Sequence, residues 1–134
     1  MDGLYFISKE HEEFYKHMLR QSGRRDKYHC AFFYCIGITE MTRDNVGKLF
    51  DFKDDSIKPE AIHAAWQTGE STEITRLAFN LWNGFMQESR EEMLCPYELF
   101  NSRFAPYYME SVKLRYPEQF RTEPKRGQEK VWFR

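Results

Sequence analysis

The sequence contains few cysteines, and no two of them are spaced as the CxxC pair of a metal site or a redox centre. There are three, Cys30, Cys35 and Cys95, and an odd number does not fit the paired framework of a small secreted domain. The count therefore favours a chain that keeps its thiols reduced. We expect a cytoplasmic protein.

Long hydrophobic runs and a large excess of charge of one sign are also missing. No apolar stretch approaches the roughly 20 residues that a transmembrane helix needs, and the first residues lack the basic start and apolar run of a signal peptide. The formal net charge is -1 and the sequence pI is about 6.4, whereas nucleic-acid binders are usually strongly basic and DNA mimics strongly acidic. We expect no membrane contact, and nucleic acid only through a partner or a local basic segment.

Short motifs for catalysis, phosphate binding and metal binding are absent. The sequence has no GxSxG, no P-loop and no GxGxxG, the patterns that place a nucleophile or cradle a phosphate. None of the histidines shows the i, i+4 spacing of a zinc-binding helix; they are His11, His17, His29 and His63. We predict no catalytic residue, no metal ligand and no cofactor.

What the sequence does have is an excess of aromatic side chains. They make up 17% of the 134 residues, as 12 Phe, 8 Tyr and 3 Trp, and hydrophobic residues make up 41%. A chain of this length and composition forms one domain with a real core. Because Phe and Tyr are bulky, we expect part of the aromatic surface to lie outside the core, in a groove or an interface.

Helix signals recur along the chain, and strand signals do not. Ser8, the acidic residues after it and Gly23 predict a helix over residues 9–21. Residues 28–38 are apolar on nearly all sides, which fits a buried helix or a buried strand, and the length of the run favours the helix. Caps, prolines and apolar periodicity predict further helices at 43–50, 59–66, 73–83, 97–102 and 107–116.

Several boundaries are predicted from single residues. We expect Thr42 to cap the helix 43–50, residues 51–58 to form a loop, Gly69 to break the helix 59–66, and Ser71 or Thr72 to cap the helix 73–83. Residues 86–93 are polar and acidic, which predicts an exposed connection. The predicted fold is mainly α, a single compact irregular bundle of about six or seven short helices. It spans residues 1–119, and a basic-aromatic tail at 120–134 either packs on it or folds on binding.

The most distinctive stretch covers residues 66–84. Placed on a helix, its apolar face consists of Ile74, Leu77, Ala78 and Leu81. The opposite side carries a polar stripe of Arg76, Asn80 and Asn83. It either faces solvent or ties neighbouring loops through its side-chain donors and acceptors, or it recognises a partner or a small ligand. The hydroxyl-rich turn 67–72 precedes this helix, but Glu70 and Glu73 would repel a phosphate there, which favours a capped structural junction over a nucleotide site.

Aromatic side chains outside the core are the other candidates for binding, since Tyr and Trp are frequent interface anchors. Core packing and stacking on nucleic-acid bases are the alternatives. The candidate binding residues are Gln67, Thr68, Arg76, Asn80, Asn83, Tyr97, Tyr107, Tyr108 and Trp132.

Four segments carry a resemblance to a known family: KPE at 58–60, AWQTG at 65–69, TRLAFNLWNG at 75–84 and PYELF at 96–100. In these segments the chain resembles a family of small uncharacterised proteins encoded by Gram-positive bacteria, their phages and mobile elements. The resemblance extends from His11 to Pro117. It implies no activity, but a setting in which small compact proteins often inhibit host defence, as anti-CRISPR proteins do.

We therefore expect a non-enzymatic phage or mobile-element accessory protein that inhibits a host defence system by binding a host protein such as a CRISPR effector. One alternative is a protein that binds or sequesters a nucleotide signal, with a site at Gln67, Thr68, Arg76, Asn80 and Asn83. The other is a small hydrolase or nuclease without a recognisable motif, for which His63, Glu98 and Glu110 are the first candidates. The sequence leaves the partner and the oligomeric state open.

Overall fold

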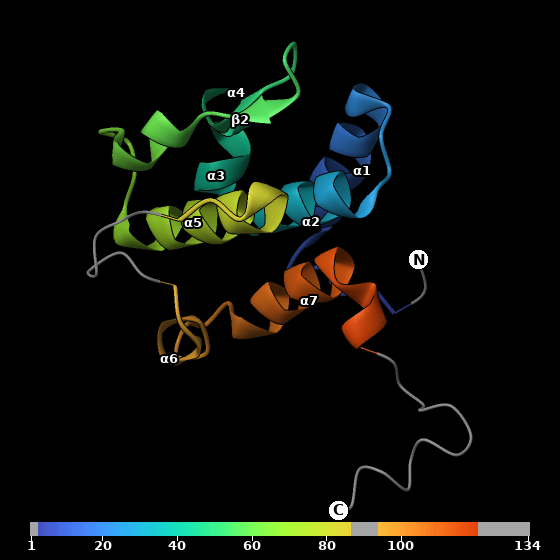
Figure 1. Cartoon of the computed structure of the whole chain (residues 1–134), viewed down its shortest axis with the longest axis vertical. Coiled ribbons are helices and arrows are strands. Elements are labelled where there is room, and N and C mark those ends of the chain that lie inside the picture. The colour runs from blue at the N-terminus through green and yellow to red at the C-terminus, as the bar shows by residue number, and fades with distance from the viewer. Residues whose placement is uncertain (1–2, 87–93, 121–134) are drawn as a thin grey trace, which may run out of the picture.

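The computed structural model describes residues 3–86 and 94–120, and it is a mainly helical bundle as predicted. Helix α2 (Lys27–Ile36) forms its centre and packs against α5 (Gly69–Asn83), α7 (Ala105–Arg115) and α1 (Lys9–Ser22). In Figure 1, α7 lies on one side of the α2–α5 pair, and the short elements between α2 and α5 lie on the other. Throughout the described residues, every helix is too short or too polar to cross a bilayer.

Helix α1 begins and ends where the sequence predicts. The hydroxyl of Ser8 accepts a hydrogen bond from the backbone N–H of His11 at 3.0 Å, which satisfies one of the free donors of the first turn. Gly23 follows the helix with a φ of 70°, in the left-handed region that glycine adopts without strain.

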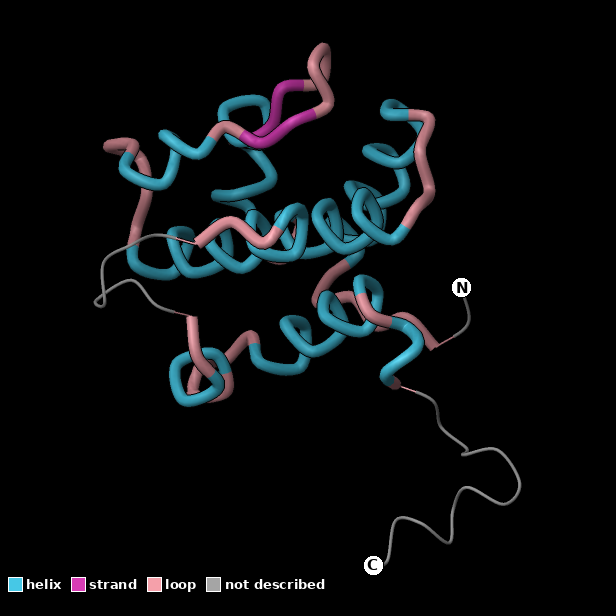
Figure 2. The backbone as a smooth tube through the Cα atoms, in the orientation of Figure 1, coloured by secondary structure: helices cyan, strands magenta, loops and turns pink. Residues whose placement is uncertain are grey.

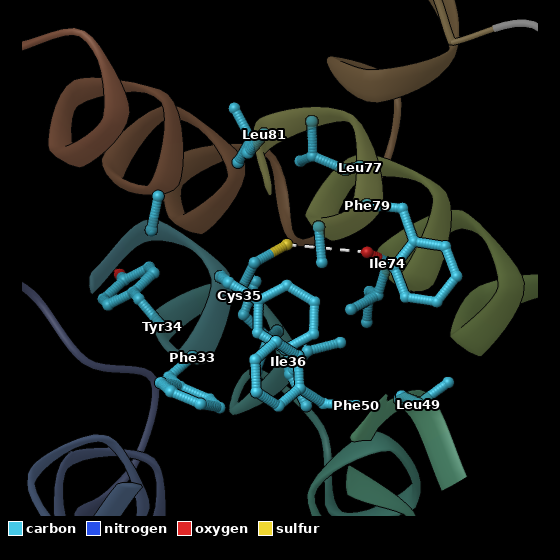
Figure 3. Close-up of a cluster of buried hydrophobic side chains, with 14 of the residues drawn as sticks. Phe33, Tyr34, Cys35, Ile36, Leu49, Phe50, Ile74, Leu77, Phe79 and Leu81 are labelled. Carbon is cyan, nitrogen blue, oxygen red and sulfur yellow. Dashed lines mark hydrogen bonds between the residues drawn. The ribbon is translucent and has the colours of Figure 1, made fainter. Parts of the chain in front are cut away.

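Helix α2 is buried on all sides over residues 31–36, which confirms the helix that the length of its apolar run favours. A helix that is apolar all round is stable only inside a core. Figure 3 shows Phe33, Tyr34, Cys35 and Ile36 packed among side chains of α5 and of the short elements, with the Cys35 thiol donating to the carbonyl of Ile74 at 3.5 Å. The N-cap of α2 is Asp26, whose carboxylate accepts hydrogen bonds from the backbone N–H groups of Tyr28 and His29.

The segment after α2 differs from the prediction in two respects. Thr39, not Thr42, caps α3 (Glu40–Asp44), and α4 (Val46–Leu49) follows as a separate turn. Thr42 is buried and donates its hydroxyl proton to the Ile36 carbonyl at 2.6 Å. The hydroxyl predicted to cap a helix is therefore bonded inside the core instead.

The predicted loop at 51–58 is instead most of a small antiparallel hairpin, with its turn at 52–55. Strands β1 (Phe50–Asp51) and β2 (Ser56–Ile57) pair with Phe50 opposite Ile57, and this hairpin is the only sheet in the described residues (Figure 2). Phe50 and Ile57 face the core, so burial of two apolar side chains holds a pairing that is too short to be stable alone.

Two further boundaries before α5 also need correction. Residues 59–66 do not form one helix, because a 3₁₀ helix, η1 (Pro59–His63), ends before Ala64. Gly69 does not break a helix but is the first residue of α5, and the N-cap is Thr68, not Ser71 or Thr72. The four apolar residues predicted to face inward from α5 are buried, which confirms that face of the helix.

The last part of the bundle consists of α6 (Pro96–Leu99), α7 and a short 3₁₀ helix, η3 (Pro117–Gln119). Tyr108 and Leu114 of α7 join the core. The guanidinium of Arg115 donates to the Leu81 carbonyl at 2.7 Å and thereby ties α7 to α5. Residues 87–93 of the predicted connection and residues 121–134 of the predicted tail lie outside the described residues.

Candidate functional site

The side chains of the turn before α5 are engaged with one another. The amide of Gln67 donates to the Ala61 carbonyl at 3.1 Å and to the Thr75 hydroxyl at 3.2 Å. Thr68 and Ser71 form a reciprocal capping box, in which each side chain accepts from the other residue's backbone N–H. The Ser71 hydroxyl also donates to the side-chain oxygen of Gln67 at 2.5 Å, and together these bonds join η1 to α5.

Two residues of the polar stripe, Asn80 and Asn83, lie where α5 ends. Asn80 donates its side-chain amide proton to the Phe85 carbonyl at 3.2 Å, and the side-chain oxygen of Asn83 accepts from the Phe85 N–H at 3.1 Å. Both contacts fix the chain as it turns through Gly84, whose φ is 81°. Arg76, the third residue of the stripe, is half-buried. The two asparagines therefore serve the C-terminal cap of α5.

The three aromatic candidates that the structure describes differ in their burial. Tyr108 is only 1% exposed, and its hydroxyl donates to the Glu73 carboxylate at 2.8 Å. Tyr107 is half-buried, with its ring 6.5 Å from that of His11. Tyr97 is 80% exposed, and Trp132 lies outside the described residues. Of the three tyrosines, Tyr97 is the one with an exposed ring.

Tyr97 belongs to a short helix at the edge of the core, against which its Leu99 packs. No residue of α6 is buried, and Phe100 directly after it is 48% exposed. In Figure 1, α6 lies at the end of α7 that is farther from α1. We call the surface formed by Tyr97 and Phe100 the α6 face. Tyr97 lies on α6 and Phe100 directly follows it, so two exposed rings lie within four residues. Exposed aromatic rings of this kind are candidates for a binding surface.

A depression of about 360 Å³ lies between α6 and the first turn of α5, and it is lined by Glu98 and Asn101, the sequence neighbours of Tyr97 and Phe100. Three carboxylates line it, Glu70 and Glu73 from α5 and Glu98 from α6, together with a single cation, Arg103. We call it the acidic notch. Arg103 donates to both oxygens of Glu70, at 3.0 and 3.1 Å, in the bidentate geometry that guanidinium and carboxylate groups favour. The sequence singles out Glu98 but does not connect it with Glu70, because they lie on different helices.

A second polar cluster surrounds His29 at the start of α2. Its Nδ1 lies 2.8 Å from the Asp26 carboxylate and its Nε2 lies 2.8 Å from the Asp55 carboxylate, while its ring packs edge-on against Trp82. Burial acts to raise the pKa of Asp26, but hydrogen bonds from the backbone and ring of His29 outweigh it and lower that pKa. Both ring nitrogens are engaged, which leaves neither of them as a base or a metal ligand.

The candidates for metal binding and enzymatic chemistry stay dispersed. Among residues 3–86 and 94–120, no group of three or more His, Cys, Asp or Glu side chains is arranged to hold a metal ion. His63 is exposed on η1, Glu98 lines the acidic notch, and Glu110 of α7 is buried and accepts from the Tyr5 N–H at 2.9 Å. They lie on three different elements.

Nearly the whole chain matches a known protein family. A model of a family of unknown function, DUF6075, matches residues 1–128. The chain belongs to this family. No curated protein and no solved structure matches it. Membership confirms the resemblance to an uncharacterised family, and it brings no activity with it.

In this member of the family, the two cysteines of α2 are held as thiols. Burial raises the pKa of Cys35 to about 12, and burial also raises the pKa of Cys30 above its usual range. Because the thiolate is the nucleophilic form, neither residue is activated for covalent chemistry. Neither α2 cysteine therefore adds a nucleophile to the fold.

Proposed function

We propose that this protein acts by binding a host protein, without covalent chemistry, and that the α6 face and the acidic notch form the contact surface. The observation that carries the proposal is the position of Tyr97, which is 80% exposed beside a notch lined by three carboxylates. Exposed aromatic side chains next to a charged depression are typical of interface anchors.

The chemistry of this surface indicates the chemistry of its partner. Three carboxylates against one arginine leave the notch negative, which favours an Arg or Lys side chain on the partner. Glu70 is already paired with Arg103 through both oxygens, so Glu73 and Glu98 are the carboxylates that would bind the partner's cation. The rings of Tyr97 and Phe100 would pack on apolar groups around that cation.

We further propose that the host protein belongs to a defence system, and that this protein is a phage or mobile-element accessory protein acting in the host cytoplasm. Two observations support this. Nucleic-acid-guided effectors such as CRISPR proteins hold their heteroduplex in a positively charged channel, which is the type of surface that an acidic notch complements. The chain also belongs to a family without known activity, in keeping with an accessory role.

A co-purification from a lysate of the native host tests the proposal. The tagged full chain is compared with Tyr97→Ala and with Glu98→Gln, and a recovered protein supports the proposal only if both substitutions deplete it. We expect Tyr97→Ala to weaken binding by about 2 kcal/mol, as for an aromatic anchor. We expect Glu98→Gln to weaken it less, and more at low salt than at high salt.

Two variants serve as matched controls. Tyr5→Ala removes another exposed tyrosine ring, and Glu10→Gln removes an exposed carboxylate on α1. Both residues lie outside the notch, so both variants should recover the partner as the natural chain does. Recovery of no stoichiometric partner, or equal recovery with Tyr97→Ala and Tyr5→Ala, would overturn the proposal.

A further inference from the structure

A separate pocket of about 410 Å³ lies between the N-terminal segment, the start of α2 and the end of α7. Figure 1 shows these three segments side by side, at the opposite end of α7 from α6. The described residues that line the pocket share none with the acidic notch. The pocket and any ligand it binds are therefore independent of the function proposed for the α6 face.

Three cations line this pocket. They are Arg25 in the turn before α2, Lys27 at its first position and Lys113 on α7. Neither Arg25 nor Lys27 forms an ion pair with another residue in the ranges 3–86 and 94–120. Their charges are therefore not neutralised by the described part of the fold.

A single carboxylate lines the same pocket, and it is already engaged. Glu110 is buried, accepts from the backbone N–H of Tyr5 at 2.9 Å, and lies 3.7 Å from the ammonium of Lys113. Among the described residues, Glu110 pairs with Lys113 and not with Arg25. The described lining of the pocket is thus net positive.

The remaining walls of the pocket are apolar. They come from Leu4, Leu114, Pro117 and Phe120, with the Cys30 thiol at one side. A volume of this size lies within the range of small-molecule sites, which combine apolar walls with a few converging polar groups. The lining therefore suits a molecule with one anionic end and one apolar end.

We propose that this pocket binds a small amphipathic anion, a phosphate or carboxylate group on an apolar body. Arg25, Lys27 and Lys113 bind the anionic group, because charge-assisted hydrogen bonds to guanidinium and ammonium groups are stronger than neutral ones. Leu114, Pro117 and Phe120 take up the apolar body and remove its surface from water. This site differs from the nucleotide site considered from the sequence, which lay at Gln67 and along α5.

Cys30 provides a reporter inside the pocket. It is half-buried there, whereas Cys95, also half-buried, lies before α6 and outside the pocket. Cys35 is fully buried. A bound ligand would shield Cys30 from a thiol reagent and leave Cys95 as reactive as before, so the two cysteines form an internal pair of probe and control.

Calorimetric titration of the full chain tests the proposal with small probes of matched chemistry. Phenyl phosphate and benzoate carry both an anionic group and an apolar body, and they distinguish phosphate from carboxylate as the preferred group. Inorganic phosphate carries the anion alone, and phenol carries the body alone. We expect phenyl phosphate or benzoate to bind at least about tenfold more tightly than either partial probe, and to slow the labelling of Cys30 but not of Cys95.

Substitutions assign the binding to this pocket. Arg25→Gln should weaken the binding of the better probe about tenfold, whereas Arg20→Gln, an exposed arginine on α1 outside the pocket, should leave it unchanged. Both are surface positions, so circular dichroism and the unfolding midpoint should match the natural chain.

Three results would overturn the proposal. They are the absence of binding by both amphipathic probes, equal binding by the variants Arg25→Gln and Arg20→Gln, and protection of Cys95 instead of Cys30. Equal affinity for phenyl phosphate and inorganic phosphate would show that the apolar walls contribute nothing to binding, which contradicts the amphipathic ligand proposed. None of these outcomes bears on host-protein binding through α6, which the co-purification tests separately.

Discussion

The Nε2 atom of His29 lies 2.8 Å from a carboxylate oxygen of Asp55, a residue that follows it by 26 positions. The other ring nitrogen of His29 binds Asp26, the N-cap of α2. One buried imidazole therefore connects the first turn of the central helix to the hairpin. Asp55 also has a φ of 55°, in the left-handed region that non-glycine residues rarely adopt.

Substitutions at Asp55 should separate the side-chain contact from the backbone conformation. Asp55→Gly keeps the backbone favourable and loses the charge-assisted hydrogen bond, and we expect it to lower the free energy of unfolding by about 1.5–3 kcal/mol. Asp55→Ala should lower it by about 1 kcal/mol more, since alanine tolerates the left-handed region poorly. Urea denaturation at neutral pH measures both, with Asp54→Ala as an exposed control. Equal losses for the glycine and alanine variants would show that the positive φ costs alanine nothing here.

The stability of the protein should fall with acid because of His11. This residue is fully buried, and burial lowers its pKa from 6.5 to about 4, against the opposing hydrogen bond to the Tyr34 carbonyl and with the charge of Arg43 adding to the decrease. Between about pH 4 and pH 6.5, the unfolded chain therefore binds a proton at His11 and the folded chain does not. Stability from this residue is complete above pH 6.5 and is lost as the pH falls toward 4, by about 1.4 kcal/mol per pH unit.

Denaturation curves at several pH values between 4.5 and 7 test this for the natural chain and for His11→Gln. Glutamine retains a donor and an acceptor but does not titrate, so the stability difference between the two proteins should shrink as the pH falls. The other three histidines are common to both and cancel in that difference. A difference that stays constant over this range would show that His11 is not the group responsible.

A methyl group added at Gly37 should destabilise the protein through packing. An ideal Cβ there would lie 2.7 Å from the Cδ2 atom of His11, 2.9 Å from that of Phe14 and 3.1 Å from the Phe33 carbonyl oxygen. We expect Gly37→Ala to lower the free energy of unfolding by about 1–3 kcal/mol. Gly47→Ala is the matched control, because it lies in α4 with no atom within 4 Å of the added group, and it should be neutral or stabilising by up to about 1 kcal/mol.

The two tyrosines Tyr97 and Tyr108 should respond differently to loss of their hydroxyl groups. Tyr108→Phe removes a buried donor to Glu73 and should lower the free energy of unfolding by about 1 kcal/mol. Tyr97→Phe should change it by less than about 0.5 kcal/mol, since the ring is exposed. Thermal or chemical unfolding of the two variants side by side measures this. A larger loss for Tyr97→Phe would mean that α6 contributes to the core.

The sequence alone predicted the elements whose signals are local. Ser8 and Gly23 bound α1, the long apolar run became α2, and the inward face of α5 follows from its apolar periodicity. These features depend on groups a few residues apart, and the helical repeat brings such groups together in any fold. Even so, local signals did not decide between competing caps, as Thr39 and Thr68 show.

Only the tertiary structure decided which distant residues meet. The buried hydroxyl of Thr42 donates a hydrogen bond to the Ile36 carbonyl. The hairpin forms because Phe50 and Ile57 are buried together. The acidic notch contains both Glu70 and Glu98, and the pocket between the N-terminal segment, α2 and α7 contains both Arg25 and Lys113. The two residues of each pair are too far apart in the sequence for helical periodicity to predict that they meet. The sequence by itself determined the helices and their buried faces, because these follow from local geometry. The packing of α2 against α5 and α7 determined the surfaces, because it places side chains from separate helices next to one another.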